Sequence, residues 1–397
     1  MIPFDEVQAK KLLVVGDDVL DITKFAPHHP GGKEIIQLQG SDATLPLINA
    51  HGIQGKLPKL PKNLRIGEID PATLEPIDRD LRALWKSLFD RGLFRYKRRW
   101  LIFDVVRAFG LWGLAWYSVH ISVVLAFVLF MVARLNVIYW VHDVCHDSVF
   151  ANRDRARFWA EWVSLFFVGT PVLDYQYGVH RIHHGFTNVI DADQALDTGP
   201  VVWHQKMLKR SSKRFVAIQA WFWFLVILPM TLPFFLGSAI YSRAKRGDWF
   251  RIMFVLVRWG LARVLFADHL ILLFLPVMAA GYMLSLTASL NHFHRPIADK
   301  FDSSFARWVT HVTQNLTERG PLARFFTGGL NFHIEHHFFA TMPRRNYPVI
   351  SAEIQAFCAK YNLPYHTCSL FEAIAALWNK LSHPFAAQPP DPEVVAP

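Results

Sequence analysis

Long apolar runs dominate the chain after residue 100 and predict helices that cross a bilayer. Residues 101–140 are almost continuously apolar, which is enough for two spans of roughly 20 residues each. Two further runs cover residues 215–241 and 269–290. We therefore expect an all-α multi-pass membrane domain with about four transmembrane helices, in which Arg107 and Arg134 extend their charged ends toward the membrane surface.

A fifth apolar run, residues 249–266, is interrupted by Arg251, Arg258 and Arg263. Because arginine is costly at the centre of a bilayer, this run predicts a helix that lies at the interface. With four spans, the basic residues at positions 243–246 fall on the side opposite the N-terminus, against the positive-inside rule. The pattern therefore specifies the spans better than it specifies the topology.

Residues 81–100 predict an amphipathic helix at the membrane surface. Leu81, Leu84 and Leu88 recur at helical spacing, and a basic cluster follows at residues 95–99. Before this helix, residues 71–80 contain two prolines and several acids without apolar periodicity, which is typical of a solvated linker.

The first 70 residues have a different pattern and predict a small α+β domain. Two short β-type runs, residues 12–15 and 19–22, precede a helical segment near residues 32–38. The predicted organisation is therefore a head domain over residues 1–70, a linker over 71–80, a membrane domain over 81–383 and a disordered Pro/Ala-rich tail over 384–397.

Composition and charge support a membrane protein. The chain of 397 residues is 52% apolar, and its mean hydropathy is +0.19. Residues 1–80 carry nine basic and twelve acidic side chains, so the remainder holds a net charge of +13. Basic flanks of apolar helices favour contact with anionic lipid and not with nucleic acid. The N-terminus lacks the pattern of a signal peptide, which predicts a cytosolic head.

The head contains a motif that can hold a haem. His29 begins a His-Pro-Gly-Gly turn and His51 follows about twenty residues later. For the turn alone, the simpler interpretation is a surface histidine. With both histidines in place, residues 1–70 resemble cytochrome b5, and the resemblance implies that His29 and His51, but not His28, are the axial ligands of haem b. We expect Ile35, Leu38 and Leu45 to line the slot; with two axial nitrogens, the iron would carry electrons and not bind O₂.

Three histidine clusters in the membrane domain predict a second metal site. On a helix, positions i, i+3 and i+4 share one face, so each cluster can direct its imidazoles to one point. Eight such nitrogens suit two metal ions, and a haem donor nearby favours iron because zinc has no redox chemistry. The isolated histidines 120, 204, 269 and 311 are excluded. The candidate ligands are His142, His146, His180, His183, His184, His333, His336 and His337.

With these boxes, nearly the whole chain resembles the membrane fatty-acyl desaturases that carry a fused cytochrome b5 head. The resemblance implies an O₂-dependent enzyme that introduces a double bond into an acyl chain at a di-iron centre. Its electrons would come from NADH-cytochrome b5 reductase through its own head. It further implies residence in the endoplasmic reticulum, with the head and a histidine-box cap on the cytosolic side, and a fatty-acyl lipid or acyl-CoA substrate.

The sequence around the third box, residues 328–347, looks closest to the front-end desaturases, which act between an existing double bond and the carboxyl end. That subgroup usually has Gln where this chain has His333, a residue that resembles the methyl-end enzymes. The family also uses a histidine outside the boxes. Asn291 and His292 match that position, with Asn291 acting through water, although His294 competes on spacing. Nearby acids that could orient the imidazoles are Asp143, Asp147, Asp191, Asp193 and Glu335.

Three alternative functions remain at this point. A fused hydroxylase, acting on a fatty acid or a sphingoid base, would use the same oxidant to insert oxygen. A membrane-tethered haem electron carrier would need no second metal site. A transporter with histidine proton relays is disfavoured, because the clusters flank the apolar runs and do not lie at their centres.

Overall fold

A computed structural model describes residues 1–171, 179–302 and 304–386 of the chain. The head contains a three-stranded antiparallel sheet in the order β1 (Leu13–Val15), β2 (Asp18–Leu20) and β3 (Arg65–Glu68). The two predicted β-type runs are β1 and β2, which pair Leu13 with Leu20 across a tight turn. The head's helices are α1 (Phe4–Ala9), η1 (Ala26–His28), η2 (Lys33–Leu38), α2 (Thr44–His51), η3 (Lys62–Leu64) and η4 (Pro71–Thr73).

Alternation of side chains gives the head sheet two different apolar faces. One face places Val14 and Val19 against Phe4 and Val7 of α1, so it is covered by the head itself. The other face, which includes Leu13, Val15 and Leu20, shares a core with Phe186, Val189, Trp308 and Val312 of the membrane domain. The head is therefore packed against the membrane domain through its own hydrophobic core.

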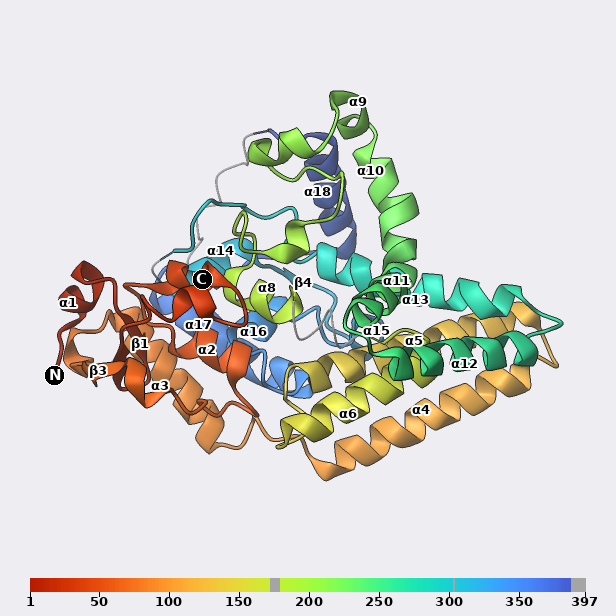
Figure 1. Ribbon diagram of the computed structural model, residues 1–397, viewed down its shortest axis with the longest axis horizontal. Helices are drawn as coiled ribbons and strands as arrows, with labels where there is room; N and C mark the ends of the chain where they lie inside the picture. Colours follow the sequence, from red (N-terminus) through yellow and green to blue (C-terminus); the bar gives the residue numbers. More distant parts are fainter. Residues whose placement is uncertain (172–178, 303, 387–397) are drawn as a thin grey trace.

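Apart from one small sheet, the remainder of the described chain is helical, as predicted. Figure 1 shows the head at one end and a layer of long helices at the other, with short helices between them. The long helices are α3 (Pro76–Asp90), α4 (Arg98–Ser118), α5 (Val123–Cys145), α6 (Arg153–Val163), α11 (Leu228–Lys245), α12 (Trp249–Leu265), α13 (Ile271–Ser289), α17 (Tyr347–Lys360) and α18 (Leu370–Ser382). The short helices are η5 (Ser164–Val168), α8 (Arg181–Phe186), η7 (Gln194–Leu196), η8 (Gln205–Arg210), α9 (Lys213–Val216), α10 (Gln219–Phe222), η9 (Trp223–Ile227), α14 (Phe305–Val312), α15 (Pro321–Thr327), α16 (His333–Phe338) and η10 (Arg344–Asn346).

Three helices in the described part of the chain are long and apolar enough to cross a membrane. They are α5, the continuous helix Gln219–Lys245 and α13. The first predicted span forms α4, which has a comparable length but carries Asp104 and Arg107 and is not among the three. Exposed apolar side chains cover both α4 and α12, including Val106 and Phe109 on α4 and Leu261 on α12. The number of spans and their orientation stay predictions.

The expectation that Arg134 extends toward the membrane surface is wrong. Its side chain is 1% exposed and lies in the helix layer, with the guanidinium carbon 4.9 Å from the Trp112 ring centroid and 5.4 Å from that of Phe130. Nη1 also donates to the Phe130 carbonyl at 3.2 Å. Two aromatic faces and a carbonyl therefore stabilise this charge within the protein.

Two arginines that complicated the predicted topology also lie inside the protein. Arg243 is buried and forms a 2.7 Å ion pair with the buried Glu161 of α6. Arg258 of α12 is buried and packs over Trp259, 4.6 Å from the ring centroid. Both cations interact with partners inside the protein. They therefore do not face lipid headgroups and should not be counted among the basic residues that determine the topology.

The amphipathic helix expected over residues 81–100 is α3, which already ends at Asp90; its apolar face packs against protein, while side chains such as Lys86 stay exposed. Leu81 and Leu88 are buried in a core formed with Val309 of α14, Phe338 of α16 and Ile350 of α17. The predicted linker over residues 71–80 is mostly helical, since η4 covers residues 71–73 and α3 begins at Pro76. The tail predicted as disordered lies, from residue 387 on, outside the described residues.

A small parallel sheet that the apolar pattern did not indicate ties the C-terminal helices to the third box. β4 (Asn315–Leu316) pairs with β5 (Thr367–Cys368). Asn315 then accepts from the backbone N–H of Ile334 at 2.8 Å and donates to Glu335 at 2.8 Å. The helix that carries the third box is thereby fixed at its first turn.

Candidate metal centre and haem pocket

Four segments bring the histidine boxes together. The first box lies at the C-terminal end of α5, the second on α8 and the third on α16, while His292 follows α13. Asn188 directly after α8 has a positive φ of 58°, a conformation that asparagine adopts more readily than most residues. Its Nδ2 donates to the His292 carbonyl at 2.7 Å, which fixes this extra histidine beside the second box.

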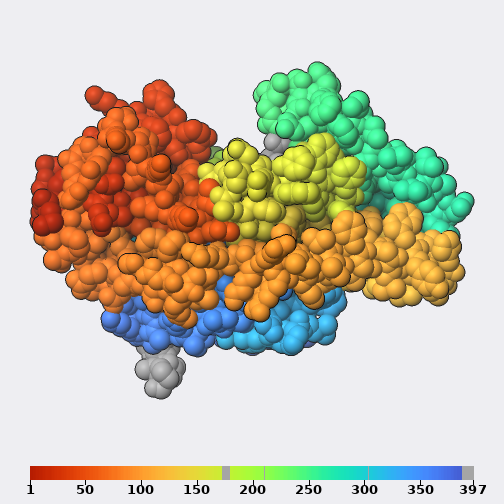
Figure 2. Space-filling model, turned by 90° about the horizontal axis from the view of Figure 1, so that it is seen from below, coloured from red at the N-terminus to blue at the C-terminus, as the bar shows by residue number. Residues whose placement is uncertain are grey.

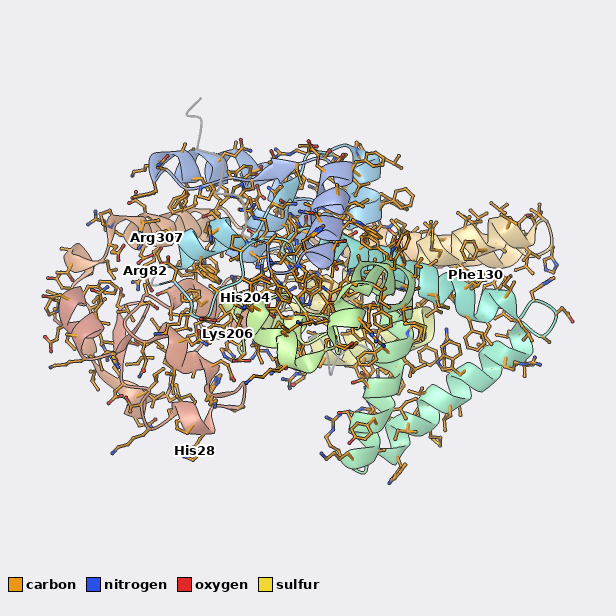
Figure 3. The ribbon with its side chains drawn as sticks, turned by 90° about the horizontal axis from the view of Figure 1, so that it is seen from above. His28, Arg82, Phe130, His204, Lys206 and Arg307 are labelled. Carbon is orange, nitrogen blue, oxygen red and sulfur yellow. The ribbon has the colours of Figure 1, made fainter. Side chains whose placement is uncertain are left out.

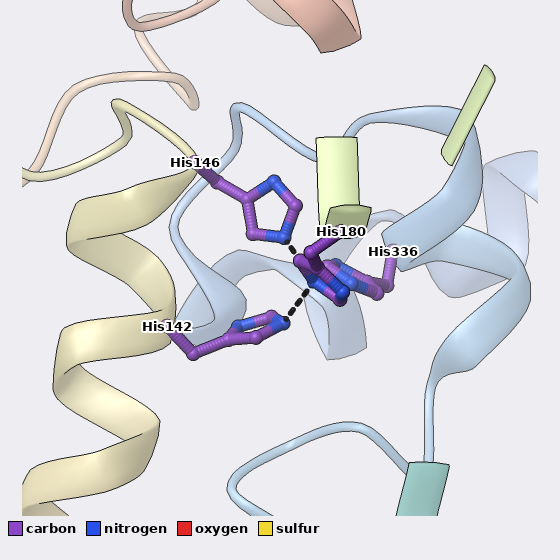
Figure 4. Close-up of side chains that lie close together, drawn as sticks. All are labelled: His142, His146, His180 and His336. Atoms are coloured by element: carbon purple, nitrogen blue, oxygen red, sulfur yellow. Dashed lines mark hydrogen bonds between the residues drawn. The ribbon is translucent and has the colours of Figure 1, made fainter. Parts of the chain in front are cut away.

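The imidazoles form two groups of the size a metal ion requires. His142, His146, His180 and His336 make the first group, which Figure 4 shows converging from three segments of the chain. His183, His292 and His337 make the second; in each group the candidate ligand atoms lie within 4.8 Å of one another. In the first group, Nε2 of His180 lies 2.9 Å from Nε2 of His146 and 3.1 Å from that of His142.

Two of the predicted ligands stand outside these groups but adjoin them. His184 lies between the groups: its ring centroid is 4.6 Å from that of His146 and 4.3 Å from that of His337. Both its nitrogens are buried without a hydrogen-bond partner, as expected for a side chain that serves a metal. His333 adjoins the second group, with Nε2 3.1 Å from Nε2 of His337.

Three imidazoles are oriented by hydrogen bonds at Nδ1. Nδ1 of His183 lies 2.8 Å from Oδ2 of the buried Asp193. Nδ1 of His336 lies 2.9 Å from the Tyr347 hydroxyl, which itself donates to the Met342 carbonyl. Because that hydroxyl proton is already used, the imidazole must be the donor, which leaves its buried Nε2 to face the first group.

Nδ1 of His337 makes the third of these contacts, 3.1 Å from the Thr187 hydroxyl, which donates to the His183 carbonyl. Thr187 follows the second box at helical spacing and Tyr347 begins α17, yet the box pattern alone named neither residue. The spacing from His183 to Thr187 was the one sequence signal that pointed to Thr187 as a residue near the box, because threonine often donates to the carbonyl four residues before it.

Of the acids predicted to orient imidazoles, Asp193 makes such a contact. Asp147 instead forms ion pairs with Arg153 at 2.9 Å and Arg181 at 2.7 Å. Glu335 accepts from Asn315 and from Tyr365. Asp143 lies 3.3 Å from Arg344, and Asp191 is exposed.

Burial keeps the imidazoles in their ligand form. Seven of the clustered histidines have a pKa well below the ordinary value, and desolvation by burial is the largest cause. Repulsion from neighbouring imidazoles lowers the pKa further. Neutral imidazole is the form that binds metals. The affected residues are His146, His180, His184, His292, His333, His336 and His337.

Residues outside the boxes take different positions. Asn291 donates to the carbonyls of Thr287 and Leu330, while its buried Oδ1 has no hydrogen-bond partner. That oxygen is a candidate for the water-mediated role predicted for Asn291. His292 belongs to the second group, whereas His294 is in neither group. The isolated histidines are also in neither group. One of them, His204, caps η8.

A cavity of about 600 Å³ lies beside the two histidines predicted to bind haem. The ring centroids of His29 and His51 are 5.9 Å apart, which is compatible with one iron between them when each metal–imidazole bond is about 2 Å. Nδ1 of His29 lies 3.1 Å from the Gly32 carbonyl, so it can donate there and leave Nε2 for the metal. A Cβ on Gly31 would come within 2.9 Å of the His29 ring, so this glycine allows the turn to close on the imidazole.

The structure agrees with some of the other predicted features of the haem slot and differs from others. Burial lowers the pKa of His51 to about 4, so its imidazole is neutral at pH 7. Ile35 and Leu38 line the cavity, but Leu45 is buried in the core beneath α3 and its expected place is taken by Leu47. His28 is exposed and lies on the outer side of the head in Figure 3. These residues fit a haem held by two axial imidazoles.

Taken together, the b5-like head, the apolar helices and the paired histidine groups define a membrane-bound oxidoreductase. The fatty acid desaturase family model matches residues 114–369, and the model of cytochrome b5-like haem/steroid binding domains matches residues 5–70. The chain therefore belongs to the fatty acid desaturase family and carries a b5-like domain at its N-terminus.

Several relatives align with nearly the full chain. It is 26% identical to the Delta(8)-fatty-acid desaturase of Euglena gracilis, over 94% of this chain and 95% of the relative. It is 28% identical to the acyl-lipid (9-3)-desaturase of Physcomitrium patens, over 90% and 72% of the two chains. It is 24% identical to a Delta(6)-fatty-acid desaturase of Caenorhabditis elegans, over 87% and 90%. The predicted enzyme class is confirmed, and the proposal of a non-catalytic carrier loses its support.

Proposed function

We propose that this desaturase holds two iron ions in its two histidine groups and oxidises an acyl chain with electrons delivered by its own head. The observation that carries the proposal is the division of seven imidazoles into two adjacent groups, each within 4.8 Å, at the end of an apolar helix. Ala50 and Asn49, which contact Arg181 of the second box and the His337 carbonyl, lie one and two residues before the head's His51, so donor and acceptor adjoin.

The ligand assignment follows the geometry. His142, His146, His180 and His336 would hold one iron, and His183, His292 and His337 the other. His184 would complete the set from its position between the groups, and His333 would adjoin the second iron, with Asn291 acting through a water. Asp193, Tyr347 and Thr187 fix three of the imidazoles through Nδ1, which preserves the ligand geometry through turnover.

Bound iron would supply the oxidising chemistry, in which an acyl CH₂–CH₂ pair, O₂, two electrons and two protons give CH=CH and two waters. The chain's own residues prepare this reaction. The neutral, buried imidazoles admit a metal without a competing proton, and the surrounding apolar core limits access of bulk water. His29 and His51 would hold the haem through one imidazole each, and the haem would supply one-electron transfer to the iron pair.

We assign the substrate as a fatty-acyl lipid or acyl-CoA that already has a double bond, with the new bond formed toward the carboxyl end. The sequence around the third box supports this front-end assignment, and the relatives named above are Delta(8)-, Delta(6)- and acyl-lipid desaturases. NADH-cytochrome b5 reductase would reduce the head, and the protein would reside in the endoplasmic reticulum with its head and metal groups facing the cytosol.

Expression in yeast fed polyunsaturated fatty acids tests the proposal. Wild type should yield a species two mass units below a supplied precursor by gas chromatography–mass spectrometry. His336→Ala should abolish it and lose non-haem iron while keeping haem, because one group loses a ligand. His29→Ala should lose haem but keep non-haem iron. His120→Ala is the control, since His120 is exposed in the turn between α4 and α5.

Three outcomes would contradict the proposal. Full turnover by purified His336→Ala would show that the assigned histidines do not form the catalytic site. A product sixteen mass units heavier than the precursor would identify a hydroxylase. If haem-loaded wild type contained no non-haem iron, the protein would be an electron carrier without a second metal site.

A further inference from the structure

The cavity beside His29 and His51 is enclosed by both domains. The head contributes the turn at His29, the end of α2 and apolar side chains. Figure 2 shows the head lying directly against the segment that contains α6. The wall contributed by the membrane domain consists of Arg153, Arg157, Arg181, Ile182, Gly185, Phe186 and Gln194.

The two walls differ in charge. All three arginines belong to the membrane domain, whereas the head wall holds no ionisable side chain apart from the two histidines. Among the described residues that line the cavity, none is a carboxylate. A ligand with an apolar body and anionic groups would therefore place its body against Ile35, Leu38 and Leu47 and its anionic groups toward the membrane domain.

Two of the arginines are fixed by contacts with the haem-ligand helix. Nη2 of Arg153 donates to the His51 carbonyl at 2.8 Å, and Nη1 of Arg181 donates to the Ala50 carbonyl at 3.1 Å. Both also pair with the buried Asp147. Arg157 lies one turn after Arg153 on α6 and lines the same cavity from an exposed position.

We propose that the membrane domain completes the haem site and that Arg157, beside Arg153, binds a haem carboxylate. Haem b has an apolar macrocycle with two carboxylates at one edge, which matches the distribution of apolar and cationic residues around this cavity. An arginine fork suits a carboxylate, and the pair is charge-assisted. Arg157 is thus a binding residue for the cofactor of the other domain.

Two properties of the haem depend on this contact. Loss of Arg157 removes a charge-assisted hydrogen bond, so the haem should dissociate faster. A cation near the haem also favours the ferrous form, which carries one positive charge less than the ferric form, so the contact raises the midpoint potential. The inference rests on the haem-binding part of the proposed function, and both properties are independent of the iron pair.

The test uses the full-length, haem-loaded protein. Arg157→Gln should transfer haem to excess apomyoglobin roughly three- to tenfold faster than wild type, a range that allows for the exposure of the pair. Its midpoint potential, measured by spectroelectrochemistry, should fall. Arg157→Glu should show both effects more strongly, and Arg157→Lys should restore most of the potential because it keeps the charge. Arg155→Gln is the matched control, since Arg155 is exposed on the same helix and does not line the cavity.

The outcomes separate this inference from the proposed function. If Arg157→Gln and Arg157→Glu match Arg155→Gln in both measurements, the membrane domain does not bind the haem carboxylate. If wild type forms no Soret band after addition of haem, the haem-binding part of the proposed function fails as well.

Discussion

At the residue scale, the candidate metal centre depends on the side chains that orient its imidazoles as much as on the imidazoles themselves. Tyr347 illustrates this dependence, because its hydroxyl accepts from Nδ1 of His336 while donating to the Met342 carbonyl. Burial holds the pKa of Tyr347 well above its ordinary value, so the hydroxyl keeps its proton and its direction. One hydroxyl therefore determines both the tautomer and the ring orientation of His336.

We expect Tyr347→Phe to lower non-haem iron affinity or desaturation by about 10- to 100-fold, the range found when such supporting residues are removed. Iron content and product yield of the purified protein measure the effect. The haem spectrum and apparent Tm should stay close to wild type, since the ring still fills its site. Tyr361→Phe is the control, because its hydroxyl contacts Pro76 and Asp80. Equal losses in both variants would show that the hydroxyl acts through general stability.

The sequence indicated which histidines lie close together, but it did not indicate the side chains that orient them. The spacing of each box specifies a shared helix face, and the structure brings those faces together. Tyr347 and Asn315 reach the third box from other elements, so no local spacing could reveal them. His184 was predicted as an ordinary ligand, and its position between the two groups follows from the packing of α8 against α16, which only the fold determines.

At the element scale, α3 shows what amphipathicity does and does not specify. The spacing of Leu81 and Leu88 correctly predicted a helix with one apolar face. It could not say whether that face meets lipid or protein, because both are apolar surroundings. In the structure α3 packs on α14, α16 and α17, which places a carboxyl group, Asp78, in the protein interior.

Asp78 should make stability depend on pH. Burial, with Asp42 and Glu75 nearby, raises the pKa of Asp78 to about 7 from an ordinary value of 3.8. Between pH 4 and pH 7 the unfolded chain releases this proton and the folded protein keeps it, so stability falls as pH rises and the full cost is present above pH 7. At 1.36 kcal/mol per pKa unit, the cost is at most about 4 kcal/mol.

The neutral variant Asp78→Asn should remove this dependence and raise the apparent Tm at pH 8, while Oδ1 of the asparagine can still accept from Ser304. Thermal scans in detergent from pH 5 to pH 8.5 measure it. Asp80→Asn on the same helix is the control: Lys360 and Tyr361 lower the pKa of Asp80, so its removal leaves the slope in this range unchanged. An identical slope in wild type and Asp78→Asn would contradict the prediction.

At the scale of the whole molecule, helix α2 and the turn that follows it connect the haem site with all three histidine boxes. The carbonyl of Asp147, next to the first box, accepts from the backbone N–H of Gln54 at 3.0 Å. Arg181, within the second box, donates to the Ala50 carbonyl. Asn49 donates to the carbonyls of His337 and Phe338 in the third box at 2.9 and 3.2 Å.

Because these contacts hold the head beside the boxes, we expect head docking to be required for electron transfer within one chain. Asn49 is buried and is not among the proposed ligands of the haem or of the iron ions. Its substitution therefore tests docking without removing a ligand. Its Oδ1 also accepts from the Ala340 N–H at 3.1 Å. Asn49→Ala would leave these buried backbone groups without partners in the docked state, at a cost of about 1–3 kcal/mol for an unsatisfied group. Because 1.4 kcal/mol is about a factor of ten, docking should weaken by roughly tenfold or more.

Stopped-flow spectroscopy of the haem band separates docking from cofactor loss. In Asn49→Ala, reduction of the haem by added reductase should stay near wild type, because the reductase approaches the head. Reoxidation with acyl substrate and O₂ present should slow, because its rate follows the docked fraction; a tenfold weaker docking slows it by at most about tenfold, the limit reached when the docked form is the minority. Asn63→Ala, an exposed residue of the same domain, should leave both phases unchanged. Wild-type reoxidation in Asn49→Ala would show that the apolar core shared by Leu13 and Trp308 holds the head without this asparagine.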